Sequence, residues 1–217
     1  MDDRRHRGDA RPDFDRFRLR TFVEALHAAG ELEVRDDPVD LADVASALEA
    51  NPKAVLFRKV GPEGWELTGN VTASRGRLAL AFGTSVAGLL PEVLRRLRLA
   101  PEIVLVPRER APVQEIVLTS EEADLTTLPV HLQHGLDGGP YISSSMDFTI
   151  DPTTGWTNVG IRRLMLRGRR ETGVDLVAPS DLRAIYEASL GRREPLPVSF
   201  VIGAHPIDHV AATMRVP

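Results

Sequence analysis

The feature that most constrains this chain is a pair of strand-like segments joined by a tight turn. Residues 141–150 (YISSSMDFTI) and 156–167 have the composition of β-strands, and residues 151–155 (DPTTG) separate them. The aspartate of this turn accepts turn hydrogen bonds, the proline presets the next φ and the glycine tolerates a positive φ. The sequence therefore predicts a β-hairpin in this part of the chain.

The sequence around this hairpin is also rich in strand patterns. Residues 113–119 (VQEIVLT) and 196–202 (LPVSFVI) are predicted as further strands, and residues 181–190 as one helix. The run from Val198 to Ile202 is apolar at both odd and even positions, so we expect a strand that is covered on both faces. Together these patterns predict a β-rich second domain.

The N-terminal sequence instead alternates between helical and strand patterns. Apolar residues recur at helical spacing over 17–29 and Gly30 follows as a stop, which predicts a first helix. A strand is predicted next, at 31–36, and Asp40 can cap a second helix. The remaining expected elements are two strands (54–60 and 65–71) and two helices (76–83 and 86–98). This α+β domain is expected to end near residue 107, with the segment PRERAP as its boundary.

Composition excludes several classes of protein. The chain has 217 residues, 42% of them hydrophobic, and a net charge of −4, as globular proteins do. It has no cysteine, which excludes disulfides, thiolate metal sites and a cysteine nucleophile, and its arginines are interspersed with carboxylates, which is not typical of nucleic-acid-binding proteins. Residues 1–16 lack apolar periodicity and are expected to be a disordered lead-in. No segment approaches the roughly 20 apolar residues of a membrane span, so a cytoplasmic location is expected.

The second hairpin strand begins with an unusual set of polar residues, TNVGIRR at 157–163. Asn158 and Arg163 are five positions apart, so strand alternation would place them on opposite faces. For both to serve one site, either Gly160 marks a bulge or Asn158 lies before the strand. Alternatively, Asn158 only closes the preceding turn and Arg163 forms a structural ion pair.

Three segments of the chain resemble the UbiD family of prenylated-FMN-dependent decarboxylases, which include the ferulic acid decarboxylases: LPVHLQHGLDGGPYIS, DFTIDPTTGWTNVGIRR and LPVSFVIGAHP. The resemblance runs from about residue 17 to Pro217. It implies an α+β fold, with an N-terminal α/β domain at 17–107 and a split β-barrel flavin-binding domain at 113–217 that is incomplete at its C-terminus. It also implies a carboxy-lyase, which removes CO₂ reversibly and without oxidation from aromatic or α,β-unsaturated carboxylic acids.

The resemblance also assigns roles to individual residues. Asn158 corresponds to an asparagine that helps to hold a divalent cation, Mn²⁺ or Mg²⁺, beside the flavin phosphate, and K⁺ is a further cation implied by the family. Arg163 corresponds to the catalytic arginine that faces the flavin, where a guanidinium can hold a substrate carboxylate bidentately. Backbone groups around Ile161 and Arg162 would line the cofactor, and Met214 falls in a second cofactor-contacting segment.

Two departures from the family pattern affect these expectations. Asp181 aligns with a metal-ligating histidine of the ferulic acid decarboxylases, and a carboxylate is also a suitable ligand for Mn²⁺ or Mg²⁺. Past Pro217 the family would supply another metal-binding glutamate, two catalytic glutamates and an oligomerisation domain. Because a carboxylic acid must return a proton to carbon after CO₂ departs, we expect the isolated chain to be inactive and to need a missing C-terminal part or a partner chain.

The implied partners are a small carboxylic acid, a flavin prenyltransferase that supplies the cofactor, and either further copies of the chain or a complementary catalytic subunit. Two alternative functions stay open: a non-catalytic flavin-binding or assembly subunit of a split decarboxylase, and a flavin-reductase-like module that uses ordinary FMN. The substrate is not determined by the sequence, because Val177, a pocket residue by alignment, does not distinguish aryl from acyclic acids.

The histidines give weaker signals. His131 and His134 have a spacing that could place two metal ligands on one helical turn, but the glycines that follow favour a loop. His205 precedes a proline and is expected to be a loop residue and not a base. His209 lies on a predicted final helix and has no assigned role.

Overall fold

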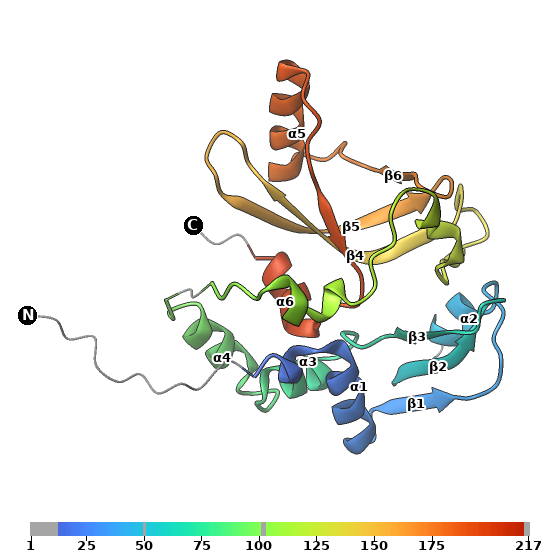
Figure 1. The fold of residues 1–217 in the computed structure, drawn as a ribbon. Coiled ribbons are helices and arrows are strands. Elements are labelled where there is room, and N and C mark those ends of the chain that lie inside the picture. Colours follow the sequence, from blue (N-terminus) through green and yellow to red (C-terminus); the bar gives the residue numbers. More distant parts are fainter. Residues whose placement is uncertain (1–12, 50, 101–102, 215–217) are drawn as a thin grey trace, which may run out of the picture.

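A computed structural model of the chain describes residues 13–49, 51–100 and 103–214. The elements form an N-terminal unit with a three-stranded sheet and a C-terminal unit with a four-stranded sheet (Figure 1). Residues 1–12 of the expected lead-in at 1–16 lie outside the described part of the chain. At the end of the lead-in, Asp15–Phe17 forms a single 3-10 turn. Among the helices in the described ranges, none is long and apolar enough to cross a membrane.

The first helix, α1 (Leu19–Ala28), forms as predicted because its apolar residues share one face. Phe22 and Leu26 are buried on that face. The chain leaves the helix at Gly30, whose φ of +71° is favourable for glycine, and continues into β1 (Leu32–Arg35).

The three strands of the N-terminal sheet have the order β1-β2-β3. The central strand, β2 (Ala54–Val60), is parallel to β1 and antiparallel to β3 (Trp65–Gly69), and both strands were predicted. Alternate residues of β2 point to opposite faces of the sheet. Ala54 therefore joins the core around α1, whereas Phe57 packs with α2 (Val44–Glu49) on the other face.

Two further helices, α3 (Arg75–Phe82) and α4 (Leu89–Arg96), complete the N-terminal unit. The side chain of Ser74 accepts a hydrogen bond from the backbone N–H of Arg77 and so caps the start of α3. Gly83 ends the same helix with a φ of +67°. Both helices were predicted, and they differ from the expected bounds by a few residues at their ends.

Between residues 97 and 140 the described part of the chain forms no strand, so the strand predicted at 113–119 is wrong. Val113, Ile116 and Leu118 are exposed by 80%, 76% and 59%. An apolar pattern becomes a strand only where a neighbour supplies the ladder hydrogen bonds, and no described strand lies beside this segment. The segment contains four 3-10 turns: η2 (Arg108–Arg110), η3 (Pro112–Gln114), η4 (Ser120–Glu122) and η5 (Leu125–Thr127).

The predicted hairpin is confirmed and forms the centre of the second sheet, whose strand order is β6-β5-β4-β7. β4 (Tyr141–Ile150) pairs antiparallel with β5 (Thr157–Leu166). β6 (Thr172–Val174) pairs with the end of β5, and β7 (Ser199–Val201) pairs with the middle of β4. In the described residues this sheet is open, and the strands do not form the closed barrel that the expected split-barrel domain would contain.

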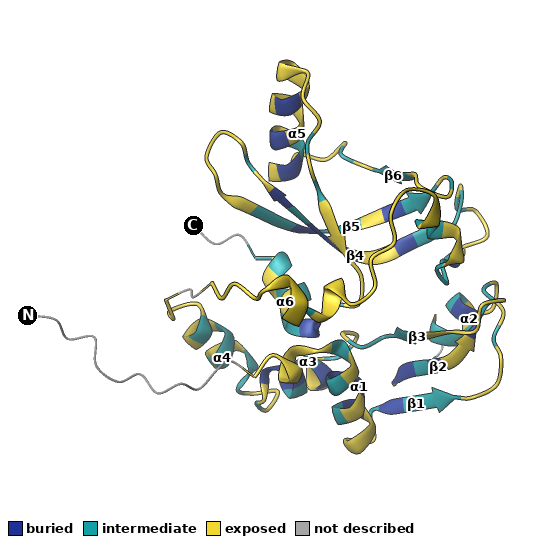
Figure 2. Cartoon of the chain, in the orientation of Figure 1, coloured by how far each residue is buried: buried dark blue, intermediate teal, exposed yellow. Residues whose placement is uncertain are grey.

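The last strand corrects another prediction. A strand was expected at 196–202, covered on both faces from Val198 to Ile202, but only Ser199–Val201 forms a strand, at the edge of the sheet. Phe200 and Val201 are 38% and 41% exposed. Figure 2 shows the segment between α5 and α6 coloured largely as exposed. The apolar composition of this run therefore does not reflect burial within the described part of the chain.

Helices lie on both sides of this sheet (Figure 1). α5 (Asp181–Arg192) was predicted, and the side chain of Ser180 caps it by accepting a hydrogen bond from the backbone N–H of Arg183. α6 (Pro206–Ala212), the predicted final helix, contacts both β5 and α3. α6 therefore connects the sheet to the N-terminal unit.

The anchor of α6 is His205, which lies before the helix as the predicted loop residue and is in addition its buried N-cap. Its Nδ1 accepts a hydrogen bond from the backbone N–H of Ile207 at 3.2 Å. Its ring packs edge-on against Phe17 and Phe22, with centroids 5.8 and 5.1 Å apart. Burial, reinforced by the positive charges of Arg16 and Arg96, lowers the pKa of His205 to about 4.

This histidine should make stability depend on pH. Between pH 6.5 and about 4 the unfolded chain binds a proton at His205 that the folded chain does not, so stability falls as the pH decreases through this window. The loss attributable to His205 should approach about 3 kcal/mol at the lower end. His205→Asn keeps a good capping side chain and should lose this component of the pH dependence in urea unfolding measured from pH 7 to 4. Equal slopes for both proteins would contradict this assignment.

Candidate functional site

The turn between β4 and β5 determines where β5 begins. Asp151 accepts hydrogen bonds from the backbone N–H of Thr153 at 2.9 Å and from the hydroxyl of Thr154 at 2.7 Å. These bonds favour the ionised carboxylate and lower the pKa of Asp151. Gly155 has a φ of +75°, so Asp151 and Gly155 have the roles in the turn that the sequence predicted.

Asn158, Gly160 and Arg162 lie on one face of β5, because alternate residues of a strand share a face. On the neighbouring strand, Asp147 stands directly opposite Gly160. Asp147 therefore lies between the side chains of Asn158 and Arg162, and it is fully buried at 0% exposure. This polar cluster, Asp147 with Asn158 and Arg162, is the most unusual feature of the sheet.

Two contacts hold the buried carboxylate of Asp147. The Nε of Arg162 lies 3.3 Å from its Oδ1, and the amide nitrogen of Asn158 donates to its Oδ2 at 3.4 Å. Burial raises the pKa of Asp147, whereas the guanidinium of Arg162 acts in the opposite direction. Neither Oδ1 nor Nε has a hydrogen bond of good geometry, so each is a buried polar atom that is not fully satisfied.

Gly160 makes this arrangement possible. A Cβ atom at this position would lie 2.9 Å from Oδ1 of Asp147 and 3.3 Å from Nη2 of Arg162. Gly160 pairs with Asp147 in regular register and does not mark a bulge, so the bulge considered from the sequence is absent there. The glycine is needed because a carboxylate and a guanidinium lie directly over its backbone.

Arg163 lies on the opposite face of β5. A bulge does occur in this hairpin, but it belongs to β4, where Ser143 and Ser144 together stand opposite Arg163. β5 itself runs without interruption, so the spacing of five residues leaves Asn158 and Arg163 on different faces.

The exposed side chain of Arg163 lines a cleft of about 330 Å³ together with Arg167. Among the described residues, neither guanidinium has an ion pair or a side-chain hydrogen bond. Gly173 on β6 leaves room for Arg167, because a Cβ atom there would lie 2.8 Å from its Nε. Two guanidinium groups in one concave site can bind a carboxylate or another anion, although Asp137 and Asp175 also line the cleft.

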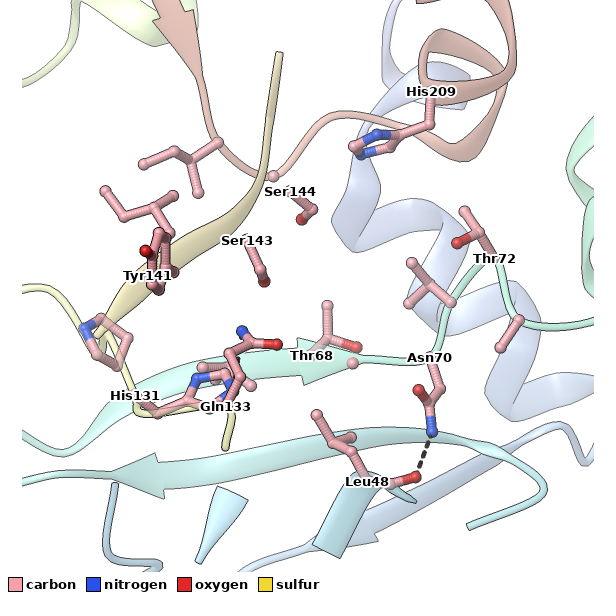
Figure 3. A pocket seen from close by; sticks show the side chains of 18 of the residues that line it. Leu48, Thr68, Asn70, Thr72, His131, Gln133, Tyr141, Ser143, Ser144 and His209 are labelled. Atoms are coloured by element: carbon pink, nitrogen blue, oxygen red, sulfur yellow. Dashed lines mark hydrogen bonds between the residues drawn. The ribbon is translucent and has the colours of Figure 1, made fainter. Parts of the chain in front are cut away.

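A larger cleft of about 1120 Å³ lies between the N-terminal unit and the second sheet. Residues of β3 line one side, and residues of β4 with the segment before it line the other (Figure 3). Asn70 is fixed in this cleft, because its amide donates to the carbonyl of Leu48 at 2.8 Å. The other labelled polar side chains of the lining are Thr68, Thr72, His131, Gln133, Tyr141, Ser143, Ser144 and His209.

The residues predicted to bind the cofactor lie in three places. Asn158 and Arg162 belong to the buried face of β5. Ile161 lines the larger cleft and Arg163 the smaller one, on the other face. Met214 is half-buried just beyond α6. The side chains alone therefore do not form one continuous site.

Part of one edge of β5 has no strand partner, and this edge borders both faces of the strand. β4 bonds along almost the whole length of β5, whereas β6 pairs only with residues 164–166. From residue 157 to residue 163, no described strand bonds the second edge. Unpaired backbone N–H and C=O groups at such an edge are available to a ligand or to another strand.

The candidate metal ligands from the sequence do not form a metal-binding cluster of their own among the described residues. The described residues contain no group of three or more His, Asp or Glu side chains that could hold a metal ion. Asp181 is the first residue of α5, and its side chain is exposed. His131 is buried in an irregular segment, where burial lowers its pKa, so it does not share a helical turn with His134.

Asp147 is the functional candidate that sequence reasoning missed. The available signal was a carboxylate at an inward position of an otherwise uncharged strand, SSSMDFTI, shortly before the DPTTG turn. The residue becomes noticeable only once the register of β4 places it opposite Gly160.

These features define a two-part α+β chain whose central hairpin carries a buried polar cluster and an open strand edge. The 3-octaprenyl-4-hydroxybenzoate carboxy-lyase Rift-related domain matches residues 104–217, and the N-terminal domain of the same family matches residues 23–97. The chain therefore belongs to the UbiD family.

Individual relatives agree with this assignment. The phenolic acid decarboxylase of Sedimentibacter hydroxybenzoicus is 30% identical over 87% of this chain and 43% of its own length. The evolved dimeric form of the UbiD-class enzyme HmfF from Pelotomaculum thermopropionicum, solved with prFMN, has a TM-score of 0.86 at 27% identity. The match covers 92% of this chain and 47% of that structure. The chain thus spans less than half the length of the relatives that it matches.

A second solved structure gives the same fold. The vanillic acid decarboxylase ShVdcCD of Sedimentibacter hydroxybenzoicus, in its closed form, has a TM-score of 0.81 at 27% identity. This match covers 92% of this chain and 45% of that one. The mixed α/β fold expected from the sequence is therefore confirmed at the level of the whole chain.

The buried pair of Asp147 and Arg162 predicts a double-mutant cycle. Arg162→Met should cost about 3 kcal/mol of unfolding free energy, because it leaves the buried carboxylate without its cation. Combining it with Asp147→Val should recover most of this loss, since two apolar residues need no partner. Urea unfolding of the four proteins measures the coupling. Additive effects of the two substitutions would show that the pair does not interact.

Proposed function

We propose that this chain forms the cofactor-binding part of a UbiD-type decarboxylase, which uses prenylated FMN to release CO₂ from an aromatic or α,β-unsaturated carboxylic acid. The observation that carries the proposal is the family match over both parts of the chain. The open edge of β5 beside Asn158 and Arg163 supports it, because no described strand pairs with this edge between the two side chains. The four-stranded sheet would then be one part of a split barrel.

The chain's own groups are suited to such a cofactor. Ile161 and Arg162 belong to the stretch of β5 that has no second strand partner, where a flavin ring could take the place of a further strand. Within the chain, their carbonyls accept from the Nη1 of Arg162 and the Oγ of Ser145. Met214 follows α6, a helix that contacts β5, so it is also a candidate cofactor contact. When bound, prenylated FMN supplies the reactive ring that accepts the electrons left behind as CO₂ departs.

A divalent cation, Mn²⁺ or Mg²⁺, is proposed with the flavin phosphate. Such ions often bind through one or two protein oxygens together with phosphate and water, so a complete protein cage is not required. The amide oxygen of Asn158 is one suitable ligand, and the carboxylate of Asp181 is a second candidate. Oxygen ligands would also accept K⁺. The remaining ligands would come from phosphate, from water or from residues outside the described set.

Arg163 is proposed as the catalytic residue of this chain. Its side chain lines the smaller cleft together with Arg167, and neither forms an ion pair with a described carboxylate, although Asp137 and Asp175 also line this cleft. A guanidinium in this setting can hold the substrate carboxylate bidentately and orient it before CO₂ leaves. The general acid that protonates carbon would be a glutamate from family sequence outside this chain, either in another part of the polypeptide or in a partner subunit.

Exposed apolar side chains support the expectation of a partner or of self-association. Ile103, Leu105, Val113 and Ile116 are each more than three-quarters exposed, at 76–89%. A flavin prenyltransferase is proposed as the supplier of the cofactor.

The cofactor is tested by co-expressing the chain with a flavin prenyltransferase and measuring the mass of the extracted flavin. Prenylated FMN is the expected product. Ordinary FMN alone, under conditions that load another UbiD-type protein with the prenylated form, would favour the flavin-reductase-like alternative. A preparation that contains no flavin would contradict the proposed function.

The role of Arg163 is tested by deuterium exchange into a panel of aromatic and α,β-unsaturated acids, with the chain supplied together with the family sequence that carries the catalytic glutamates. Arg163→Gln should lower kcat/KM by about 100-fold, since a charge-assisted bidentate contact is lost. Flavin content should not change. Arg95→Gln, an exposed arginine on α4, is the matched control and should have wild-type activity. Wild-type exchange by Arg163→Gln would exclude the catalytic role.

A further inference from the structure

We propose that Asp147 is a positioning residue that fixes the amide of Asn158 with its oxygen turned toward the cation and flavin phosphate; this inference rests on the proposed function. Nothing in the sequence comparison assigned a role to Asp147. The basis of the proposal is the buried cluster on the shared face of β4 and β5.

The chemistry of a carboxylate determines the orientation of its neighbour. An ionised carboxylate only accepts hydrogen bonds, whereas an asparagine side chain has one donor end and one acceptor end. The end of Asn158 that faces Asp147 must therefore be the NH₂ group. This agrees with the hydrogen bond of 3.4 Å from Nδ2 of Asn158 to Oδ2 of Asp147. Its oxygen then points away from Asp147, and no donor among the described residues hydrogen-bonds to it.

Asp147 is itself held in place. Its side chain has no solvent exposure, and the backbone of Gly160 lies directly beneath its carboxylate. The Nε of Arg162 lies 3.3 Å from Oδ1. The carboxylate of Asp147 thus has a guanidinium beside one oxygen and the amide of Asn158 beside the other.

The energetic cost of the cluster also indicates a function beyond stability. A buried ion pair can often be replaced by apolar residues with no loss of stability, and here one atom of each partner lacks a well-formed hydrogen bond. Buried polar groups of this kind tend to occur where a site requires them. The site that this pair adjoins is Asn158, which is half-buried and therefore still accessible to a ligand.

The test is titration of the 217-residue chain with FMN, followed by flavin fluorescence, with and without MnCl₂. In Asp147→Asn the new side chain can donate or accept, so the amide of Asn158 is free to turn its oxygen inward. The apparent affinity for Mn²⁺ in the presence of FMN should fall by about 10-fold to 100-fold, as is usual when the partner of a metal ligand is lost. The affinity for FMN without metal should be retained.

Two further variants separate positioning from general damage. Thr149→Val removes another buried polar group from the same face of β4, whose hydroxyl donates to the carbonyl of Pro197, and it should bind Mn²⁺ normally. Gly160→Ala keeps both charges but forces the carboxylate of Asp147 to move, and it should show the same loss of Mn²⁺ affinity as Asp147→Asn. It provides the test if Asp147→Asn does not fold.

The outcomes distinguish the inference from the proposed function. Failure of the wild-type chain to bind either FMN or prenylated FMN would overturn the proposed function. If the wild-type chain binds flavin but responds to neither Mn²⁺ nor Mg²⁺, the positioning role of Asp147 is overturned while flavin binding stands. The inference alone is also overturned if Asp147→Asn or a folded Gly160→Ala keeps the wild-type response to Mn²⁺. Equal weakening of flavin binding with and without metal would indicate a purely structural role.

Discussion

The register of β4 against β5 is the constraint on which the rest of the site depends. Side chains alternate along a strand, so a shift of one residue would move Asn158 and Arg162 to the other face and would bring Arg163 to the buried one. The DPTTG turn sets this register at one end of the hairpin. The bulge at Ser143 and Ser144 changes it further along β4, so that Ile142 again faces inward beside Leu164.

The same register explains why one glycine and one aspartate belong together. Asp147 is buried at the position where β5 has no side chain, and the guanidinium of Arg162 reaches the carboxylate across that gap. Any larger residue at position 160 would displace one of the two charges. In a sheet whose inner face is otherwise formed by residues such as Ile142 and Leu164, this pair is the one place where charge is buried at the centre of the hairpin.

Sequence patterns predicted most of the elements, because local periodicity determines where helices and hairpins can form. The hairpin, α1 and α5 were recognised from spacing, turn residues and caps. The failures share a physical reason. A strand at 113–119 and double coverage at 196–202 both require a neighbour that the pattern of one segment does not reveal. His205 was missed as a cap for the same reason, since its burial depends on Phe17 and Phe22 from the far end of the chain.

The candidate site was also only partly predictable. Residue types and the family resemblance identified Asn158 and Arg163, and alternation correctly warned that they would face apart. Neither expected remedy is found, because Gly160 marks no bulge and Asn158 lies within β5 rather than before it; the unpaired edge of β5 offers a different one. A flat ligand that takes the place of the next strand would contact the backbone of Ile161 and Arg162. From that position it has Asn158 on one side of the sheet and Arg163 on the other. If the cofactor binds at this edge as proposed, opposite faces would keep the phosphate and its cation apart from the place where a substrate carboxylate binds.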